Sequence, residues 1–441
     1  MHTENYGFIK VLNNANAQFR SSLHQKWFSP CALRAHRASV CRLSGELTFP
    51  ESMKRIGIVL GSSPGKGVYQ YAQAVLDAFL RLPRDSYELV VAYEHPVWEA
   101  QIPPGSATII RLRRDSVRSR AFNRLWHAAN FSMGAWRKIG KYADPNVRAL
   151  VDADCDLWLN PSNENWAFRA PIPALGTIHD LMHIYEPHFP EVGSAAEIAE
   201  RDFHFRETCR WSKGIVVDSE IGKQHVVDEY HVPSDSVFPL PYIAPRYIYD
   251  SASAPPVELP YELPKKFFFY PATFWRHKNH AGLFAALVQL HDKYPDMRLV
   301  LAGANQNGYD EAVRKVEELG IKEHVVVLGF VPEAHMFELY RRARALIMPT
   351  FFGPTNIPQL EAFVAGCPVA TSRIYGIPQQ VGNAALLFDP SSVTEIATCM
   401  ERLWTDDALC SQLSERGYAH ARAWGPVQFA SRLRSIIDEV V

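Results

Sequence analysis

Short apolar runs alternate with longer amphipathic stretches along most of this 441-residue chain. The runs are rich in Val, Ile, Leu and Phe and are bounded by Gly, Pro or polar residues, which is typical of buried strands. The predicted strands lie at residues 56–60, 87–93, 108–112, 156–160, 174–178, 215–218, 237–242, 267–270, 297–302, 325–328, 345–348 and 369–371. Because most of them are followed by a helix-length stretch, the alternation predicts an α/β protein with doubly wound parallel sheets.

A stretch rich in Pro, Ala and Ser interrupts this alternation and reads SASAPPVELPYELP. This composition is typical of a linker, so we assign residues 251–264 to a connection between two domains. The chain before it, residues 53–250, is predicted to form one Rossmann-like domain, and residues 265–423 are predicted to form a second. Residues 424–441 are predicted to be a final helix.

Residues 1–52 differ from the rest of the chain, with six Lys or Arg, three acidic residues and little periodicity. We expect a poorly ordered N-terminal extension without a catalytic role. Two alternatives are an upstream translation artefact, with Met53 as the true start, and a cleaved targeting peptide, because the stretch is Arg-rich and acid-poor.

The bulk composition argues against several classes of protein. A net charge of −1 and a pI near 7.0 give no field that would attract nucleic acid. The seven cysteines include no C-x-x-C pair, which argues against a zinc or disulfide framework and for a reducing compartment. No apolar run approaches the roughly 18 residues of a membrane span, so we predict a cytoplasmic protein, attached at most to the inner face of the membrane.

One segment, from Arg111 to Lys141, carries nine Lys or Arg and a single acidic residue, with four aromatic residues interleaved. A basic face with aromatic anchors is what a helix on an anionic membrane needs. The alternative is a solvated helix whose aromatic face packs on its own domain. We keep both interpretations of this basic segment.

The most informative stretch follows the predicted strand at 345–348. A loop broken by Gly and Pro comes next, and then a short helical pattern at 359–365 that ends at Gly366. Free N–H groups and the helix dipole make such a strand–loop–helix start favourable for an anion. Glu361, in the first turn, can cap the helix or accept hydrogen bonds from the hydroxyls of a ligand.

This stretch resembles the signature of retaining glycosyltransferases of family 4 (glycosyltransferase group 1), which have the GT-B fold and use nucleotide-sugar donors. The family pattern is a Glu, seven residues, a second Glu and a short helix that ends in Gly-x-Pro-Val. Here Glu361 is the second Glu and the helix ends in GCPV at 366–369, while Gly353 stands in the place of the first Glu. The resemblance implies two facing Rossmann-like domains, an acceptor-side domain and then a donor domain, with helix 424–441 crossing back to the first.

Three residues are implied to be catalytic. His179 and Asp180 follow the strand at 174–178 and match a His-Asp motif of the cleft wall, where the His contacts the donor sugar near its reacting carbon. Lys278 matches the phosphate-binding lysine of the family. The family's Arg usually lies five residues earlier, where this chain has Thr273, so Arg276 is expected to supply that charge.

Three further elements complete the implied donor site. The first loop of the N-terminal domain lies near the donor phosphate and sugar, and the turn after residues 325–328 holds the nucleotide base. The loop before Glu361 contributes N–H groups to the diphosphate, and Glu361 itself binds the ribose hydroxyls. In this order the implied residues are Gly65, Gly67, Phe330, Val331, Thr355, Asn356, Ile357 and Glu361.

The implied activity is the retaining transfer of a hexosyl group, with GDP-mannose as a guess for the donor, to a glycan or lipid-linked acceptor in polysaccharide or lipopolysaccharide synthesis. On that scheme neither a metal nor another cofactor is needed. Gly353 keeps a second class open, a nucleotide-sugar epimerase or a non-catalytic nucleotide-sugar-binding protein of the same fold. A zinc site of His179, His183 and His188 is a further alternative, against which the intervening Pro187 argues.

Overall fold

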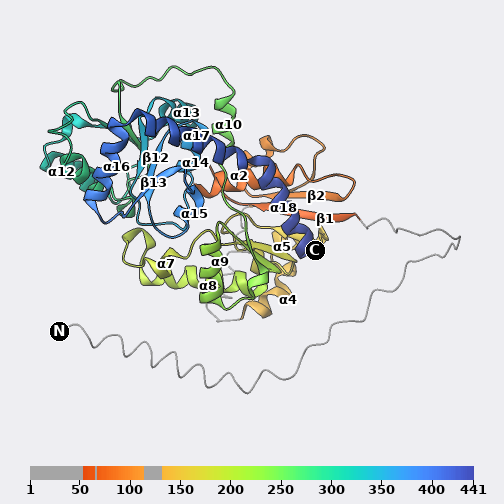
Figure 1. Ribbon diagram of the computed structural model, residues 1–441. Coiled ribbons are helices and arrows are strands. Elements are labelled where there is room, and N and C mark those ends of the chain that lie inside the picture. The colour runs from red at the N-terminus through yellow and green to blue at the C-terminus, as the bar shows by residue number, and fades with distance from the viewer. Residues whose placement is uncertain (1–52, 65–66, 114–131) are drawn as a thin grey trace, which may run out of the picture. The chain divides into compact units, whose positions relative to one another are not determined.

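The computed structural model describes residues 53–64, 67–113 and 132–441 (Figure 1). The expectations for residues 1–52 and for Gly65 lie outside this part of the chain, as does the middle of the basic segment. The described residues belong to one structural unit.

Seven parallel strands form the first sheet, in the order β3-β2-β1-β4-β5-β6-β7. The strands run outward in both directions from β1, so the sheet is doubly wound. The bounds are β1 Lys54–Leu60, β2 Tyr87–Tyr93, β3 Thr108–Arg111, β4 Leu157–Leu159, β5 Ala174–Thr177, β6 Gly214–Val217 and β7 Val237–Pro239.

Helices cover this sheet and connect its strands. They are α2 Gly67–Phe79, η1 Pro96–Gln101, α4 Met133–Ala143, α5 Pro145–Asp152, α6 Trp166–Arg169, α7 Met182–Tyr185, η2 Pro190–Val192, α8 Ala195–Trp211, α9 Glu220–Tyr230, η3 Ser234–Ser236 and α10 Arg246–Ala252. The sequence did not predict α8, because its apolar residues do not gather on one helical face. A capping box of Ser194 and Glu197 begins this helix and was its available sequence signal.

Six parallel strands form the second sheet, in the order β10-β9-β8-β11-β12-β13. They are β8 Phe268–Pro271, β9 Leu299–Ala302, β10 Val325–Val327, β11 Ala345–Met348, β12 Val369–Ser372 and β13 Ala385–Phe388. The prediction of two doubly wound parallel sheets is confirmed. The edge strand β13 was not predicted, and most of its side chains are only partly buried.

The second sheet has its own helices. They are η4 Arg276–Lys278, α11 His280–Val288, α12 Tyr309–Glu318, η5 Lys322–His324, α13 Glu333–Arg342, α14 Pro358–Val364, α15 Ile377–Val381, α16 Val393–Thr405, α17 Asp407–Ala423 and α18 Pro426–Val440. Between α10 and β8 the chain forms no helix or strand.

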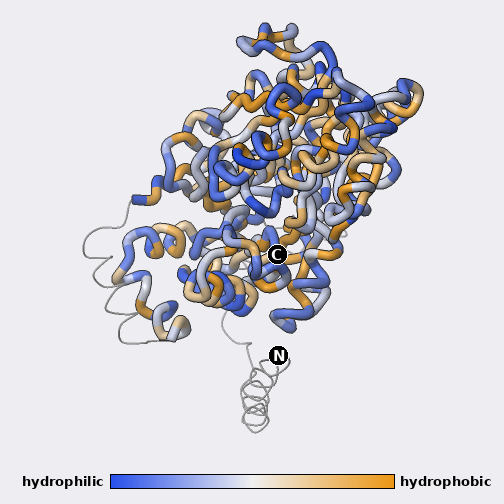
Figure 2. Tube along the Cα trace, turned by 90° about the vertical axis from the view of Figure 1, so that its left-hand side faces the viewer, coloured by the Kyte–Doolittle hydropathy of each residue, from blue (hydrophilic) through white to orange (hydrophobic). Residues whose placement is uncertain are grey.

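Each sheet is held by apolar side chains on both faces. In β1, Ile56 and Leu60 belong to the cluster that α2 and α18 cover, whereas Val59 belongs to the cluster on the opposite face. In the second sheet, Phe268 and Phe269 are consecutive and fully buried, as expected for a parallel strand covered on both sides. Hydrophobic and hydrophilic segments alternate along the chain in Figure 2.

The last helix leaves the second sheet and packs on the first. Phe429, Leu433, Ile436 and Ile437 of α18 are buried in the same apolar cluster as α2, and Figure 1 shows α18 close to α2 and β1. Within the described part of the chain, no helix is both long and apolar enough to cross a membrane.

Candidate active site

His179 lies directly beyond the carboxyl end of β5, where open α/β sheets place their ligands. Its Nδ1 is 3.0 Å from the Tyr242 hydroxyl, and its ring meets the edge of Tyr71. Burial lowers the pKa of His179 to about 4, so the imidazole is neutral at pH 7. Its Nε2 is buried, and a hydrogen bond with the backbone of Pro161 opposes the lowering of the pKa.

Asp180 follows on the same loop. Its carboxylate accepts a hydrogen bond from the Met182 N–H at 3.0 Å, and burial raises its pKa. The positive charges of Arg201 and Lys278 partly oppose this rise.

Lys278 ends the short turn η4 after β8 of the second sheet. Its backbone carbonyl accepts from the Tyr270 hydroxyl at 2.8 Å, and its ammonium lies 3.5 Å from the Asn356 side-chain oxygen. Burial lowers the pKa of Lys278 to about 8, while the carboxylates of Glu191 and Asp180 act in the opposite direction. A bound anion would stabilise the ammonium of a lysine in this setting more strongly than that of an exposed lysine.

The structure does not bring Arg276 to this group. Its side chain is exposed and pairs with Glu311 of α12 at 3.0 Å. The predicted role of Arg276 at the diphosphate therefore requires this surface ion pair to open.

The loop after β11 has a backbone that only glycine adopts readily. Gly353 has φ +101°, and a Cβ there would lie 3.2 Å from the Thr355 carbonyl oxygen. A glutamate at this position would therefore be strained in the observed loop. This gives the departure from the family pattern a physical basis.

Gln380 of α15 and Asp218 fix the rest of this loop. The Asn356 N–H donates to the Gln380 side-chain oxygen at 3.0 Å, and the Asn356 carbonyl accepts from the Gln380 amide at 2.8 Å. The Asn356 N–H is thus occupied, whereas its side-chain nitrogen is buried without a partner in the described structure. The Thr355 hydroxyl donates to Asp218, which follows β6 of the first sheet. Ile357 immediately precedes α14.

Glu361 is buried and already holds two hydroxyls. The Tyr340 hydroxyl donates to one carboxylate oxygen at 2.6 Å, and the Tyr247 hydroxyl donates to the other. Burial raises the pKa of Glu361, and these two hydrogen bonds oppose the rise. Each carboxylate oxygen keeps a further lone pair, so its predicted contact with a ribose is compatible with this arrangement.

The remaining predicted donor residues are spread out. Val331 is buried in the core of the second sheet, whereas the side chain of Phe330 is 74% exposed. Gly67 is exposed at the start of α2. Their contacts with a donor stay predictions.

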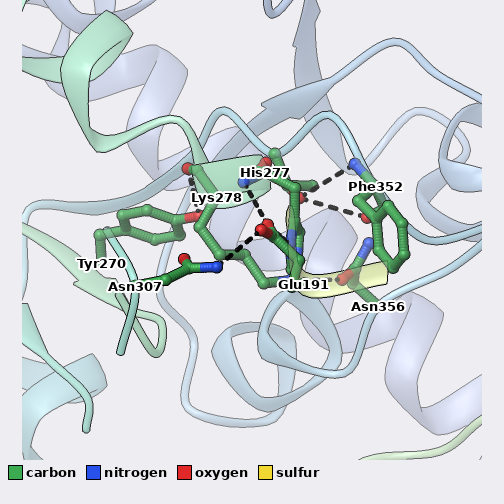
Figure 3. A network of polar contacts seen from close by, with 8 residues as sticks. Glu191, Tyr270, His277, Lys278, Asn307, Phe352 and Asn356 are labelled. Atoms are coloured by element: carbon green, nitrogen blue, oxygen red, sulfur yellow. Dashed lines mark hydrogen bonds and ion pairs between the residues drawn. The ribbon is translucent and has the colours of Figure 1, made fainter. Parts of the chain in front are cut away.

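Two carboxylates near the site were not predicted. Asp218 occupies the same position after β6 as His179 does after β5, so the rule for strand ends could have found it. Burial raises the pKa of Asp218 to about 7. Glu191, in the turn η2, contacts the second half of the chain, and no local sequence pattern marks it (Figure 3).

The segment around η2 contacts the loops of the second sheet at three points. Glu186 accepts a hydrogen bond from the Tyr375 hydroxyl, and Phe189 stacks on Phe351 with ring centroids 6.0 Å apart. Glu191 contacts the turn that carries Lys278. These contacts join the carboxyl ends of the two sheets directly beside the predicted site.

One cavity adjoins these residues, and a second lies in the first domain. The first, of about 280 Å³, is lined by Asp218 and Tyr242 from the first half and by Thr355 and Gln380 from the second. The other, of about 1110 Å³, is lined by residues of α4, α6 and α8, among them Arg201.

The described ends of the basic segment pack on their own domain. Trp136 is buried, and the Arg137 guanidinium donates to the carbonyls of Phe168 and Ala170 at 2.8 and 2.5 Å. Arg137 also lies over the Trp211 ring. These contacts agree with the alternative that the aromatic side chains of this end of the segment pack on their own domain. Membrane binding by the segment stays a prediction.

In the residues that the structure covers, no three His, Cys, Asp or Glu side chains come together as a metal site. His179, His183 and His188 therefore do not form the alternative zinc site. His183 is instead buried against the ring of Phe205.

Known proteins resemble this chain in part of its sequence and in its fold. A family model described as glycosyl transferases group 1 matches residues 257–420. The O-antigen chain mannosyltransferase B of Escherichia coli is 28% identical over 254 residues, which are 56% of this chain and 66% of that protein. A D-inositol 3-phosphate glycosyltransferase of Corynebacterium glutamicum (strain R) is 28% identical over 171 residues, which are 37% of this chain and 41% of that protein. The matches thus span less than two thirds of these relatives.

Solved structures resemble almost the whole described chain. Anabaena Alr3699/HepE in complex with UDP has a TM-score of 0.61 at 15% identity, over 88% of this chain and 100% of that one. An alpha,alpha-trehalose-phosphate synthase (UDP-forming) from Burkholderia vietnamiensis has a TM-score of 0.64 at 13% identity, over 89% and 98%. At these identities the likeness establishes the fold alone.

Proposed function

We propose that the protein transfers a hexosyl group from a nucleotide sugar to a glycan or lipid-linked acceptor, because a family model described as glycosyl transferases group 1 matches residues 257–420. The process is polysaccharide or lipopolysaccharide synthesis. Relatives named mannosyltransferases favour a mannosyl donor. The neighbour in complex with UDP supports a nucleoside diphosphate as the group that the site holds.

The observation that carries this proposal is the buried ammonium of Lys278, which the carboxylates of Asp180 and Glu191 favour in its charged form. Glycosyl transfer leaves negative charge on the departing diphosphate and develops positive charge at the anomeric carbon. A partly desolvated ammonium stabilises the diphosphate more strongly than an exposed one. The neutral imidazole of His179 is proposed to contact the donor sugar.

In the proposed reaction the configuration of the sugar is retained. The bond between the anomeric carbon and the donor phosphate oxygen breaks as the acceptor oxygen bonds to the same carbon from the same face. The acceptor's hydroxyl proton passes to the departing phosphate oxygen. The scheme needs no metal, because the Lys278 ammonium and the polar groups of the loop offset the charge of the diphosphate.

The acceptor is proposed to bind on the side of the first sheet. The cavity of about 1110 Å³ is lined there by Trp136, Phe168 and Trp211, together with charged residues such as Arg201. Aromatic faces with charged rims suit a glycan. A cytoplasmic location and contact of the basic segment with the inner, anionic face of the membrane belong to the same proposal.

A panel of UDP-, GDP-, ADP- and dTDP-sugars tests the donor site by thermal shift. A ligand at a hundred times its dissociation constant adds about 2.7 kcal/mol to the stability of the folded state. We expect one nucleotide to raise the melting temperature of the wild type, and the shift to be lost in Lys278→Ala. Lys315→Ala, which removes an exposed lysine of α12, serves as the control and should keep the full shift. If no nucleotide sugar raises the melting temperature of the wild type, the donor assignment is wrong.

The alternative activity is separated by leaving out the acceptor. The presence of Gly353, where the family pattern has a glutamate, is the observation that favours it. An epimerase would convert the bound donor into a second nucleotide sugar without acceptor, which NMR of the donor alone detects. A transferase needs an acceptor for rapid turnover, and a non-catalytic binder shows the thermal shift without turnover under either condition.

A further inference from the structure

Glu191 reaches from the first half of the chain into the loops of the second. Its carboxylate side chain is only 5% exposed. One oxygen accepts the backbone N–H of His277 at 2.7 Å and also contacts the His277 ring nitrogen Nδ1. The other accepts the Asn307 side-chain amide at 3.2 Å. Figure 3 shows this carboxylate between His277 and Asn307, beside Lys278.

Among the residues that the structure describes, Glu191 forms no direct ion pair with a Lys or Arg, and its ion-pair partner is His277. Burial and the neighbouring Lys278 lower the pKa of His277, so this imidazole stays neutral beside the carboxylate. Burial alone would raise the pKa of Glu191, but the hydrogen bonds from His277 and Asn307 lower it overall. The carboxylate is therefore ionised, and its negative charge favours the charged form of Lys278.

The contacts of Glu191 also hold the turn that carries this lysine. The His277 N–H and ring are tied to Glu191, and the His277 carbonyl accepts the Phe351 N–H at 2.8 Å. The Lys278 carbonyl is tied to the Tyr270 hydroxyl. Both oxygens of Glu191 thus hold neighbouring residues, which is how this carboxylate can act on the turn of Lys278.

We propose that Glu191 is a positioning residue for Lys278: it fixes the turn across the two halves of the chain, and its charge keeps the Lys278 side chain as an ammonium where the donor diphosphate binds. This inference rests on the proposed function in one respect, the assignment of Lys278 to the diphosphate. The claim about the charge state of Lys278 stands independently of any ligand.

The charged groups around Lys278 make the effect of Glu191 measurable. Glu191 faces the lysine from η2, and Asp180 faces it from the loop after β5. His277 in its own turn and His280 of α11 also lie close, and burial lowers the pKa of both, so neither carries charge at neutral pH. Among the described residues, Glu191 and Asp180 are thus the two carboxylates that oppose the desolvation of the ammonium.

Glu191→Gln removes the charge and leaves an amide oxygen that can still accept the His277 N–H. Glu191→Ala removes both charge and hydrogen bonds. Glu186→Gln is the matched control, because Glu186 also bonds across the two halves, to Tyr375, without touching the turn of Lys278. All three variants are compared with the full-length wild type.

The first measurement needs no nucleotide. The rate at which an amine-reactive reagent acylates Lys278, followed by mass spectrometry across pH 6 to 10, reports the midpoint of its titration. We expect the midpoint to fall by about one pH unit in Glu191→Gln, because the charge that favours the ammonium is gone. Glu186→Gln should match the wild type. An unchanged midpoint in Glu191→Gln overturns the proposal.

The second measurement is the affinity for the nucleoside diphosphate that the thermal panel identifies. With a midpoint one unit lower, the affinity of Glu191→Gln should equal that of the wild type at pH 6. It should be about threefold weaker at pH 7.5 and about tenfold weaker at pH 9. A merely structural role would weaken binding equally at every pH, and that result also overturns the proposal.

The two measurements separate this inference from the proposed function. If no nucleotide binds the wild type but the Lys278 midpoint still falls in Glu191→Gln, the donor assignment fails and the control of the lysine by Glu191 stands. If the nucleotide binds the wild type but the Lys278 midpoint does not move in Glu191→Gln, the donor assignment stands and the control of the lysine by Glu191 fails.

Discussion

At the scale of single residues, desolvation sets the charges of the site. Burial lowers the pKa of His179 to about 4 and of Lys278 to about 8, and it raises the pKa of Asp218 to about 7. In each case the neutral form is favoured, because a charge taken out of water loses its hydration. The site therefore combines a neutral imidazole with two groups that titrate near physiological pH.

The Asp218 carboxyl makes the stability of the protein depend on pH. Its pKa is higher in the folded than in the unfolded chain, so its contribution is fully present below about pH 4 and is lost as the pH rises through about 7. Asp218→Asn removes this titration. We subtract the free energy of unfolding of the wild type from that of Asp218→Asn, both measured by urea unfolding. This difference should be higher at pH 8 than at pH 5 by on the order of 1 kcal/mol or more.

The control for this prediction is Asp228→Asn, at an exposed position of α9. Its stability relative to the wild type should be the same at both pH values. A flat difference for Asp218→Asn would mean that Asp218 is ionised in the folded state throughout this range.

Gly353 gives a second prediction at this scale. Alanine there must adopt φ +101° and places its Cβ 3.2 Å from a carbonyl oxygen. We expect Gly353→Ala to lower the free energy of unfolding by about 1–3 kcal/mol in thermal or denaturant melts. Gly105→Ala has a positive φ of 74° but open space around the new methyl group, so its loss should be smaller. Equal losses of unfolding free energy in the two variants would show that the loop relaxes to relieve the contact between the new Cβ and the Thr355 carbonyl oxygen.

At the scale of elements, α18 contributes buried apolar side chains to the core of the first sheet. Phe429 is fully buried in the cluster shared with α2, so Phe429→Ala removes a large apolar side chain and leaves a cavity. We expect the free energy of unfolding to fall by about 3–5 kcal/mol. Val427→Ala lies on the exposed side of the same helix and should change stability by less than about 0.5 kcal/mol in the same melts. A similar effect of both substitutions would contradict the observed packing of α18.

The strands were predictable because strands of parallel sheets are buried on both faces and read as continuous apolar runs. The runs at 87–93 and 345–348 coincide with β2 and β11. Helix α8 escaped prediction because its apolar residues do not form a stripe. The edge strands β3 and β10 were predicted although they are little buried, whereas the edge strand β13 was not, so burial alone does not explain which strands local pattern located.

The residues of the candidate site also divide into those that the sequence pattern located and those that it did not. His179 and Lys278 follow strands, so their positions could be inferred from the rule that ligands bind at the carboxyl ends of strands. Glu191 and Tyr247 could not, because each acts on a partner more than 80 residues away in sequence. Such contacts depend on how the two sheets meet, which no local pattern encodes.

At the scale of the described molecule, the two sheets are joined by polar contacts that also hold the site. Asp218 binds Thr355, Glu191 binds the turn of Lys278, and Glu186 binds Tyr375. A change in the relative position of the sheets must therefore alter the loops around Lys278 and Asn356. The affinity for the donor and the arrangement of the two halves are expected to be coupled through these residues.

The return of α18 to the first sheet also affects biosynthesis. The strands of the first sheet leave the ribosome before those of the second, but the apolar surface around Tyr71 and Val75 of α2 stays open until Phe429 and Leu433 are made. The N-terminal half therefore cannot complete its core during translation and must wait for nearly the whole chain. Nascent chains that pause before residue 426 would expose this surface and be natural clients of chaperones.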